Sequence, residues 1–158
     1  MKIFLSILFL YLTISNAKSI ETKIVHKIQN EIITSIDIKK EFRYLVALNN
    51  SLKKLEKEKI LTISNESLIR EKVKKIEILK NFKEIEKNNE YLIFLLKNVY
   101  LKLNLKSLKE FELYLKDFDL TIEEVKRKIT IDALWNEVII KKYASQVTIN
   151  KDQIKKNL

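Results

Sequence analysis

The chain has 158 residues, enough for one domain with a substantial core, and its 46% hydrophobic and 33% charged residues are typical of a globular protein. It contains no glycine, proline or cysteine, which excludes glycine-rich phosphate loops, disulfides, cysteine nucleophiles and zinc–cysteine sites. The net charge is +10, but nearly all cations are lysines that alternate with glutamates along the chain. This pattern favours a solvated helical surface, and no nucleic-acid partner is expected.

The first 17 residues have the pattern of a secretory signal peptide. Lys2 provides a short positive start, residues 3–14 form an apolar stretch, and residues 15–17 (SNA) end in the small residue typical of a cleavage site. Cleavage is expected between Ala17 and Lys18, which predicts a periplasmic location. The apolar stretch is shorter than the roughly 20 residues of a transmembrane helix. No stable membrane span is therefore expected after signal removal, and an uncleaved N-terminal anchor is the alternative.

The mature chain begins with a segment of β-type composition. Residues 23–34 contain many β-branched side chains, and Asn30 is the best candidate for a turn with positive φ, so a short hairpin or extended segment is expected. Ser35 then serves as the expected N-cap of a helix over residues 36–50, with Asp37 in its first turn. The apolar residues of this helix have helical spacing: Ile38, Phe42, Leu45, Val46 and Leu48. The lysine-rich residues 51–62 follow as a polar connection or a helical extension.

Two further helices are predicted before residue 104. Ser64 or Asn65 is the expected cap of the first, which ends near residues 88–89 and carries an apolar stripe of Ile69, Val73, Ile76, Leu79 and Phe82. The second, residues 91–103, is apolar on all sides around YLIFLL. A helix of this kind is expected to be central in the core or covered by another chain.

Capping boxes mark the starts of the last two helices. Ser107 with Glu110 and Thr121 with Glu124 both follow the S/T-x-x-E pattern. The second box opens the longest helix, about 122–145, whose apolar side is Ile122, Val125, Ile129, Trp135, Val138 and Ile139. The predicted fold class is all-α: a bundle of about five helices with a short N-terminal β-hairpin or extended segment. The predicted domain spans residues 18–147. Residues 148–158 are interpreted as the start of a following segment that is missing or truncated.

Catalytic chemistry has little support in the residue types. His26 is the only histidine, so no Ser-His-Asp set and no histidine-based metal cluster is expected. Glu123 and Glu124 are explained by helix capping, and the pair Asp117 and Asp119 lacks the further oxygen ligands of a calcium site. We therefore predict a protein without catalytic residues, metal or cofactor.

Aromatic side chains offer the best candidate binding surface. They could line a groove for apolar peptide or fill the helical core, and both alternatives remain open at this stage. The polar tips of Tyr114 and Trp135 favour the groove for these two residues. The candidate client-binding residues are Tyr91, Phe94, Phe111, Tyr114, Phe118 and Trp135.

The order of these motifs resembles a known family. Residues 24–42 (IVHKIQNEIITSIDIKKEF) are similar to the start of SurA-type periplasmic chaperones, the parvulin-class peptidyl-prolyl isomerases, with Ile36 inserted between Ser35 and Asp37. Residues 118–155 resemble the closing part of the same N-terminal domain, where Thr121, Glu124, Val125 and Lys126 match the family's capped long helix. The resemblance covers about residues 23–157. It implies a chaperone that holds unfolded outer-membrane β-barrel proteins through apolar contacts, without ATP.

Two departures from the family limit what the resemblance implies. The isomerase domains would begin near Thr148, and the sequence ends at Leu158, so no parvulin active site and no isomerase activity are assigned. The family's core domain is also completed by a helix that follows the isomerase domains, and its absence would leave part of the groove open. Three hypotheses follow: a binding module for unfolded protein clients, the front part of a longer isomerase, and a membrane-anchored structural or interaction protein.

Overall fold

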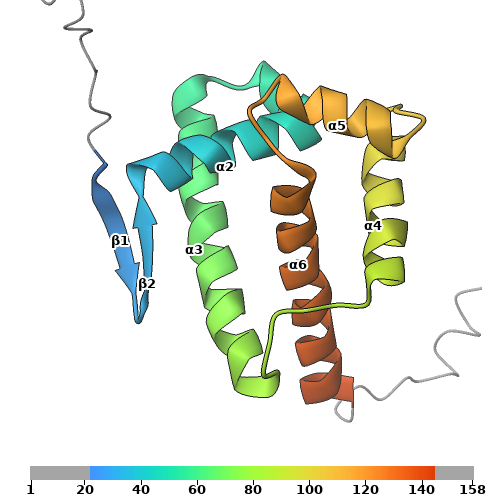
Figure 1. Cartoon of the computed structure of the whole chain (residues 1–158). Helices are drawn as coiled ribbons and strands as arrows, with labels where there is room; N and C mark the ends of the chain where they lie inside the picture. Colours follow the sequence, from blue (N-terminus) through green and yellow to red (C-terminus); the bar gives the residue numbers. More distant parts are fainter. Residues whose placement is uncertain (1–21, 145–158) are drawn as a thin grey trace, which may run out of the picture.

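The computed structural model describes residues 22–144, which fold into a β-hairpin and a bundle of helices (Figure 1). The expected signal peptide, its cleavage site at Ala17 and Lys18, and residues 148–158 lie outside the described residues. The elements in chain order are β1 (Ile24–Ile28), β2 (Glu31–Thr34), α2 (Ser35–Leu48), the 3₁₀ helix η1 (Asn50–Lys54), α3 (Lys57–Asn81), α4 (Asn89–Lys102), α5 (Leu108–Lys116) and α6 (Ile122–Tyr143). The predicted fold class, an all-α bundle with a short N-terminal hairpin, is confirmed.

The helices form an array with α6 in its middle. In Figure 1, α6 stands between α3 and α4, while α2 and α5 cross one end of the array. This position explains why α6 buries residues around much of its circumference, including Ile131, Ala133 and Leu134, which the predicted single stripe left out. A helix with neighbours on two sides needs more than one apolar stripe.

The hydrophobic core has two parts, and α6 contributes to both. One cluster joins α2, α4, α5 and the start of α6, and its buried members are Ala47, Leu96, Phe111, Leu115, Leu120, Ile122 and Val125. The other joins α3 to the second half of α6 through Ile78, Ile131, Leu134 and Val138. The long last helix therefore ties the two halves of the bundle together.

The N-terminal hairpin packs against α3. Its strands pair antiparallel, and Ile33 of β2 is fully buried. His26 on β1 lies with Nε2 2.9 Å from Asn65 Oδ1 on α3, which gives this histidine a half-buried structural position. The positive φ of the turn falls on Gln29 (53°), so the expectation that Asn30 would adopt it was wrong.

Several predicted helix ends differ from the observed ones because the caps lie elsewhere. Thr34, not Ser35, caps α2, and its hydroxyl and backbone N–H form a complete capping box with Asp37. Helix α3 begins at Lys57, so Ser64 and Asn65 are interior residues, and the buried Ser64 hydroxyl donates to the Ile60 carbonyl. Helix α3 also ends at Asn81, well before the predicted residues 88–89.

The two predicted capping boxes have different outcomes. Thr121 and Glu124 form the complete box at the start of α6. At α5, Ser107 accepts from the Glu110 N–H, but the Glu110 carboxylate accepts from the Lys106 N–H instead of the Ser107 N–H. Both serine and threonine therefore mark their helix starts, as predicted.

Helix α4 is not central in the core, so the first of its two predicted alternatives was wrong, while cover by another chain stays a prediction. It lies at the edge of the array beside α6 (Figure 1), and Asn88 caps its first turn. Leu96 is buried, whereas Tyr91, Ile93, Phe94 and Leu101 remain 44–58% exposed. One side of this apolar helix is thus left uncovered by the described residues.

Candidate functional site

A groove between α4 and α6 is the best candidate binding site. Its volume is about 290 Å³, and its walls come from Tyr91, Leu95, Asn98, Val99 and Lys102 on α4 and from Ile129, Asp132, Ala133 and Asn136 on α6. The lining combines apolar side chains with a few polar groups, the usual chemistry of a site for peptide or small apolar groups. Of the six candidate aromatic residues, only Tyr91 lines this groove.

The other aromatic candidate on α4, Phe94, lies three positions after Tyr91 but does not line the groove. Its side chain is 58% exposed and faces solvent rather than the groove. Lys87 Nζ lies 5.5 Å from the centre of the Tyr91 ring, a cation–π distance. Of the two exposed aromatic residues of α4, only Tyr91 therefore contributes to the groove.

Three of the candidate aromatic residues, on α5 or just after it, belong to one core cluster: Phe111, Tyr114 and Phe118. Phe111 has no exposed surface, so it cannot contact a client while the bundle is folded. The rings of Tyr114 and Phe118 are in tilted contact, with their centres 5.1 Å apart, and both side chains pack half-buried on the same cluster. The Tyr114 hydroxyl donates to the Ala47 carbonyl at 2.7 Å, and burial, followed by the charge of Asp117, raises its pKa. The polar tip of Tyr114 therefore joins α5 to α2.

Trp135, the sixth candidate, is half-buried on the other side of the bundle. It packs on the Ile78, Ile131, Leu134 and Val138 cluster beside Phe82 and Ile85. Trp135 lies on α6 but does not line the groove with α4, so the six aromatic side chains do not form one surface. Sequence reasoning missed the groove residues Ile129 and Ala133, because no local pattern shows which side of α6 faces α4.

A network of charged side chains occupies the space between α2, α3 and α6. Glu41 on α2 is only 2% exposed, and its Oε1 accepts a hydrogen bond from the Ser67 hydroxyl at 2.7 Å. Lys128 Nζ on α6 lies 2.6 Å from Glu41 Oε2 and also pairs with Glu71 on α3. Glu41 Oε2 has no hydrogen bond of good geometry within the described residues, and the ammonium group of Lys128 is its ion-pair partner.

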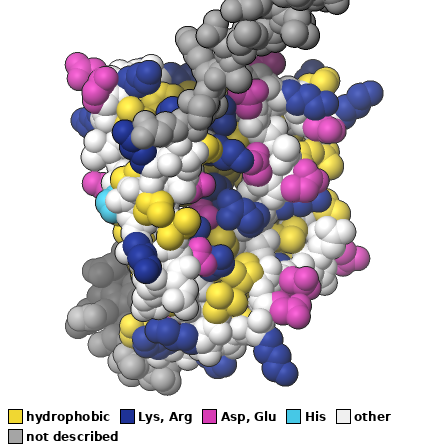
Figure 2. Space-filling view, turned by 60° about the vertical axis from the view of Figure 1, so that its left-hand side comes forward, with side chains coloured by type: hydrophobic (Ala, Val, Ile, Leu, Met, Phe, Trp, Pro, Cys, Tyr) yellow, Lys and Arg dark blue, Asp and Glu magenta, His cyan; other side chains and the backbone are white. Residues whose placement is uncertain are grey.

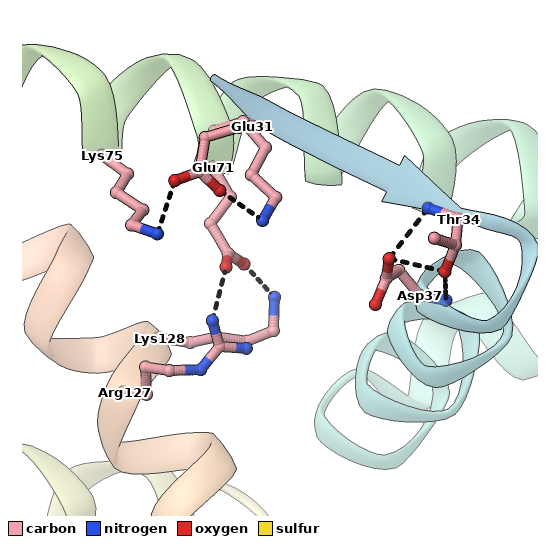
Figure 3. A network of polar contacts seen from close by, with 8 residues as sticks. Glu31, Thr34, Asp37, Glu71, Lys75, Arg127 and Lys128 are labelled. Atoms are coloured by element: carbon pink, nitrogen blue, oxygen red, sulfur yellow. Dashed lines mark hydrogen bonds and ion pairs between the residues drawn. The ribbon is translucent and has the colours of Figure 1, made fainter. Parts of the chain in front are cut away.

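The same network extends to the hairpin. Figure 3 shows Glu71 held by Arg127 and Lys128, with Glu31 of β2 close by. Glu31 accepts from Lys72 at 2.8 Å and from Lys75 at 2.6 Å, both on α3. In the space-filling view, side chains of both charges meet along the middle of this face, with hydrophobic side chains beside them (Figure 2).

The electrostatics of this network follow from burial and from its neighbours. Burial alone would raise the pKa of Glu31, but the hydrogen bonds and charges of Lys72 and Lys75 outweigh it and hold the pKa below its usual value of 4.5. Burial and the nearby carboxylates of Glu41 and Asp132 raise the pKa of Tyr44 far above its usual range. A cavity of about 120 Å³ lies among these groups, between Tyr44, Ser67 and Lys128. The lysine and arginine side chains around this cavity neutralise its carboxylates. We therefore interpret the network as a structural connection between α2, α3 and α6.

Within residues 22–144, no group of three or more His, Asp or Glu side chains is arranged to hold a metal ion. In the same part of the chain, no helix has the length and apolar character needed to cross a bilayer.

Comparison with known proteins gives no relative from which a function could be transferred. No protein-family model, no curated protein and no solved structure matches the chain. The features of this chain that bear on function are therefore the groove and the residue patterns of the sequence.

Proposed function

We propose that this chain is a periplasmic, ATP-independent chaperone module that binds unfolded protein clients, outer-membrane β-barrel proteins in particular. Binding rather than catalysis is the proposed activity. The single observation that carries this proposal is the groove of about 290 Å³ between α4 and α6. Its apolar walls and scattered polar groups suit an extended peptide whose apolar side chains need cover and whose backbone needs hydrogen-bond partners.

The groove offers contacts for both kinds of group. Tyr91, 44% exposed, supplies a large ring with a hydroxyl at its tip, and Leu95 and Val99 continue the apolar wall along α4. Asn98 and Asn136 place amide groups on opposite helices at the groove, where they could bond to client backbone. Lys102 at the end of α4 adds a positive charge, which favours encounter with acidic clients.

The periplasmic location and the family are part of the same proposal. The pattern of residues 1–17 supports export, and the resemblance of residues 24–42 and 118–155 to the SurA-type N-terminal domain supports a chaperone role. A hairpin followed by a helical bundle agrees with the architecture that this resemblance implies. No isomerase activity is proposed for these residues.

Suppression of aggregation is the direct test. An outer-membrane β-barrel protein is diluted from urea, and light scattering is followed with and without residues 18–158 of this chain. We expect suppression at near-stoichiometric amounts. Tyr91→Ala should weaken it several-fold, because truncating a central aromatic contact commonly costs more than about 1 kcal/mol of binding energy.

Tyr143→Ala is the matched control for the groove. Tyr143 on α6 is 42% exposed, close to the 44% of Tyr91, and Lys142 Nζ lies 5.8 Å from its ring, but it does not line the groove. We expect this variant to behave like the wild type. Absence of suppression by a chain that circular dichroism shows to be helical would reject the stand-alone chaperone. Equal loss in both tyrosine variants would reject the groove as the binding site.

A further inference from the structure

The groove between α4 and α6 has an apolar floor and a polar rim. Leu95, Val99 and Ile129 are half-buried and Ala133 is buried, so these side chains form the floor. The amide and charged side chains of the lining are exposed and form the rim: Asn98, Lys102, Asp132 and Asn136. A site of this kind buries the apolar groups of a ligand and leaves its charged groups at the edge. The charges on the rim therefore decide which charged client residues the groove accepts.

Two charged side chains line the groove, and only one of them has an ion-pair partner among the described residues. Asp132 Oδ1 lies 2.6 Å from Lys74 Nζ of α3, which neutralises its charge. Near the start of α4, Lys87 pairs with Glu137 of α6, so the charges at that end of the groove are also balanced. Lys102 lies at the other end, in the last turn of α4, and takes part in no ion pair within residues 22–144.

The acids of α4 and α5 do not compensate this lysine. Glu90 lies twelve positions before Lys102, about 18 Å along the helix axis. The Glu110 carboxylate accepts from the backbone N–H of Lys106, and Glu112 is paired within α5. Lys102 therefore gives one end of the groove a positive charge that a ligand can neutralise.

The spacing of the α4 side chains matches that of an extended peptide. Tyr91, Leu95 and Val99 follow each other at four positions, which is about 6 Å along the helix axis. Alternate residues of an extended chain are about 6.6 Å apart and point to the same side. Three apolar side chains at alternate positions of a peptide can therefore contact these three residues in turn. The next side chain on the same side of the peptide then comes within reach of Lys102.

We propose that Lys102 makes the groove selective for client segments that carry a carboxylate two positions beyond such a set of apolar residues, on the same side of the extended chain. This inference rests on the proposed function, because it concerns the clients of the same groove. An Asp or Glu side chain at that position pairs with Lys102, whereas a carboxylate on the opposite side faces solvent. Either chain direction satisfies these contacts, so the acid can follow or precede the apolar residues.

Fluorescence anisotropy with labelled, C-terminally amidated peptides tests this selectivity. One peptide has three apolar residues at alternate positions followed on the same side by Glu. A second has Gln in place of Glu, and a third has the composition of the first with the Glu moved by one position to the opposite side. A second set has the reversed sequences. In one of the two sets, we expect residues 18–158 to bind the same-side Glu peptide about threefold more tightly than the other two, with the difference lost at high salt.

Matched variants identify Lys102 as the source of the selectivity. Lys102→Gln should remove the preference for the same-side Glu peptide, and Lys102→Glu should reverse it in favour of the Gln peptide. Lys97→Glu is the control, because Lys97 is exposed on the same helix but does not line the groove. This variant should retain the preference, and circular dichroism checks that all variants are folded. Equal loss of the preference in Lys97→Glu and Lys102→Glu would overturn the proposal, because it would show an effect of net charge alone.

The other outcomes separate this selectivity from the chaperone function. Equal affinity of the wild type for all peptides would reject the selectivity and leave the groove as the client site. If the folded chain binds none of the peptides, the selectivity is rejected as well, and suppression of aggregation decides on the chaperone function by itself. A chain that elutes as a dimer in gel filtration, and as a monomer after Tyr91→Ala, would show that a second copy occupies the groove and would also overturn the proposal.

Discussion

The ammonium group of Lys128 is shared by two carboxylates from different helices. It meets Glu41 of α2 and Glu71 of α3, and it lies 4.8 Å from the centre of the Tyr44 ring. The Lys128 side chain is only 12% exposed, so its ammonium group has lost most of its hydration. Its carboxylate partners must therefore replace the contacts with water. The three helices α2, α3 and α6 are thereby held in one arrangement by a single side chain.

Replacing Lys128 by Met should be strongly destabilising. The substitution leaves the Glu41 carboxylate buried without its counter-charge, and we expect a loss of about 3–5 kcal/mol in the free energy of unfolding. The double variant Lys128→Met/Glu41→Gln should recover part of that loss, because the neutral amide can still accept from Ser67. Urea unfolding followed by circular dichroism measures Lys128→Met, Glu41→Gln and the double variant. Additivity of the two single changes within about 0.5 kcal/mol would contradict the coupling.

Glu31 predicts a specific acid dependence of stability. Its pKa is lowered in the folded chain, so its contribution is fully present above the unfolded value near 4.5 and is lost as the pH falls through the folded pKa. Glu31→Gln should therefore cost about 1 kcal/mol at neutral pH. The difference between wild type and variant should shrink as the pH falls below about 4.5. A difference that stays constant between pH 7 and pH 3 would show that the ion pairs with Lys72 and Lys75 do not contribute.

The hairpin is the element in which the absence of glycine has the clearest consequence. Its turn requires a positive φ, and Gln29 adopts it at 53° although a residue with a Cβ is disfavoured there. Asn104 and Asp119 carry the positive φ of two other connections, and Asn and Asp tolerate this region better. The hairpin thus contains a strained position, and the ion pairs of Glu31 with Lys72 and Lys75 hold the hairpin on α3.

Gln29→Gly should stabilise the protein. Glycine adopts the positive φ without steric cost, so we expect a gain of up to about 1 kcal/mol in the free energy of unfolding. Asn30→Gly is the control at the neighbouring position, where φ is not positive. It should be neutral or slightly destabilising, because glycine adds freedom to the unfolded chain. Thermal unfolding measures the stability of both variants. Equal changes in the melting temperature would contradict the presence of backbone strain at Gln29.

At the scale of the whole molecule, α6 unites the bundle while α4 remains at its edge. The buried side of α6 reaches both core clusters, one with α4 and α5 and one with α3. Helix α4 packs through Leu96, Val99 and Tyr100, and part of its remaining surface forms one wall of the groove with α6. The candidate binding site therefore depends on a helix at the edge of the bundle.

Much of the fold was predictable because its signals are local. The capping box at Thr121 and Glu124 and the helical spacing of apolar residues depend on side chains within four positions of each other, and they identified the α-helices, although not all of their ends. Where two caps competed locally, as Thr34 and Ser35 did, the wrong one was chosen. The early end of α3 at Asn81 was also missed, because helical spacing alone does not show where the chain turns.

The binding surfaces were not predictable in the same way. Residue type alone did not distinguish Phe111, which is fully buried, from Phe94, which is 58% exposed, because exposure depends on which helix packs across each ring. Glu41 and Lys128 are separated by 87 positions, so no local pattern indicated their ion pair. Composition, periodicity and caps determine the elements of this protein. The packing of distant elements determines which of their apolar and charged side chains meet each other and which remain for a partner.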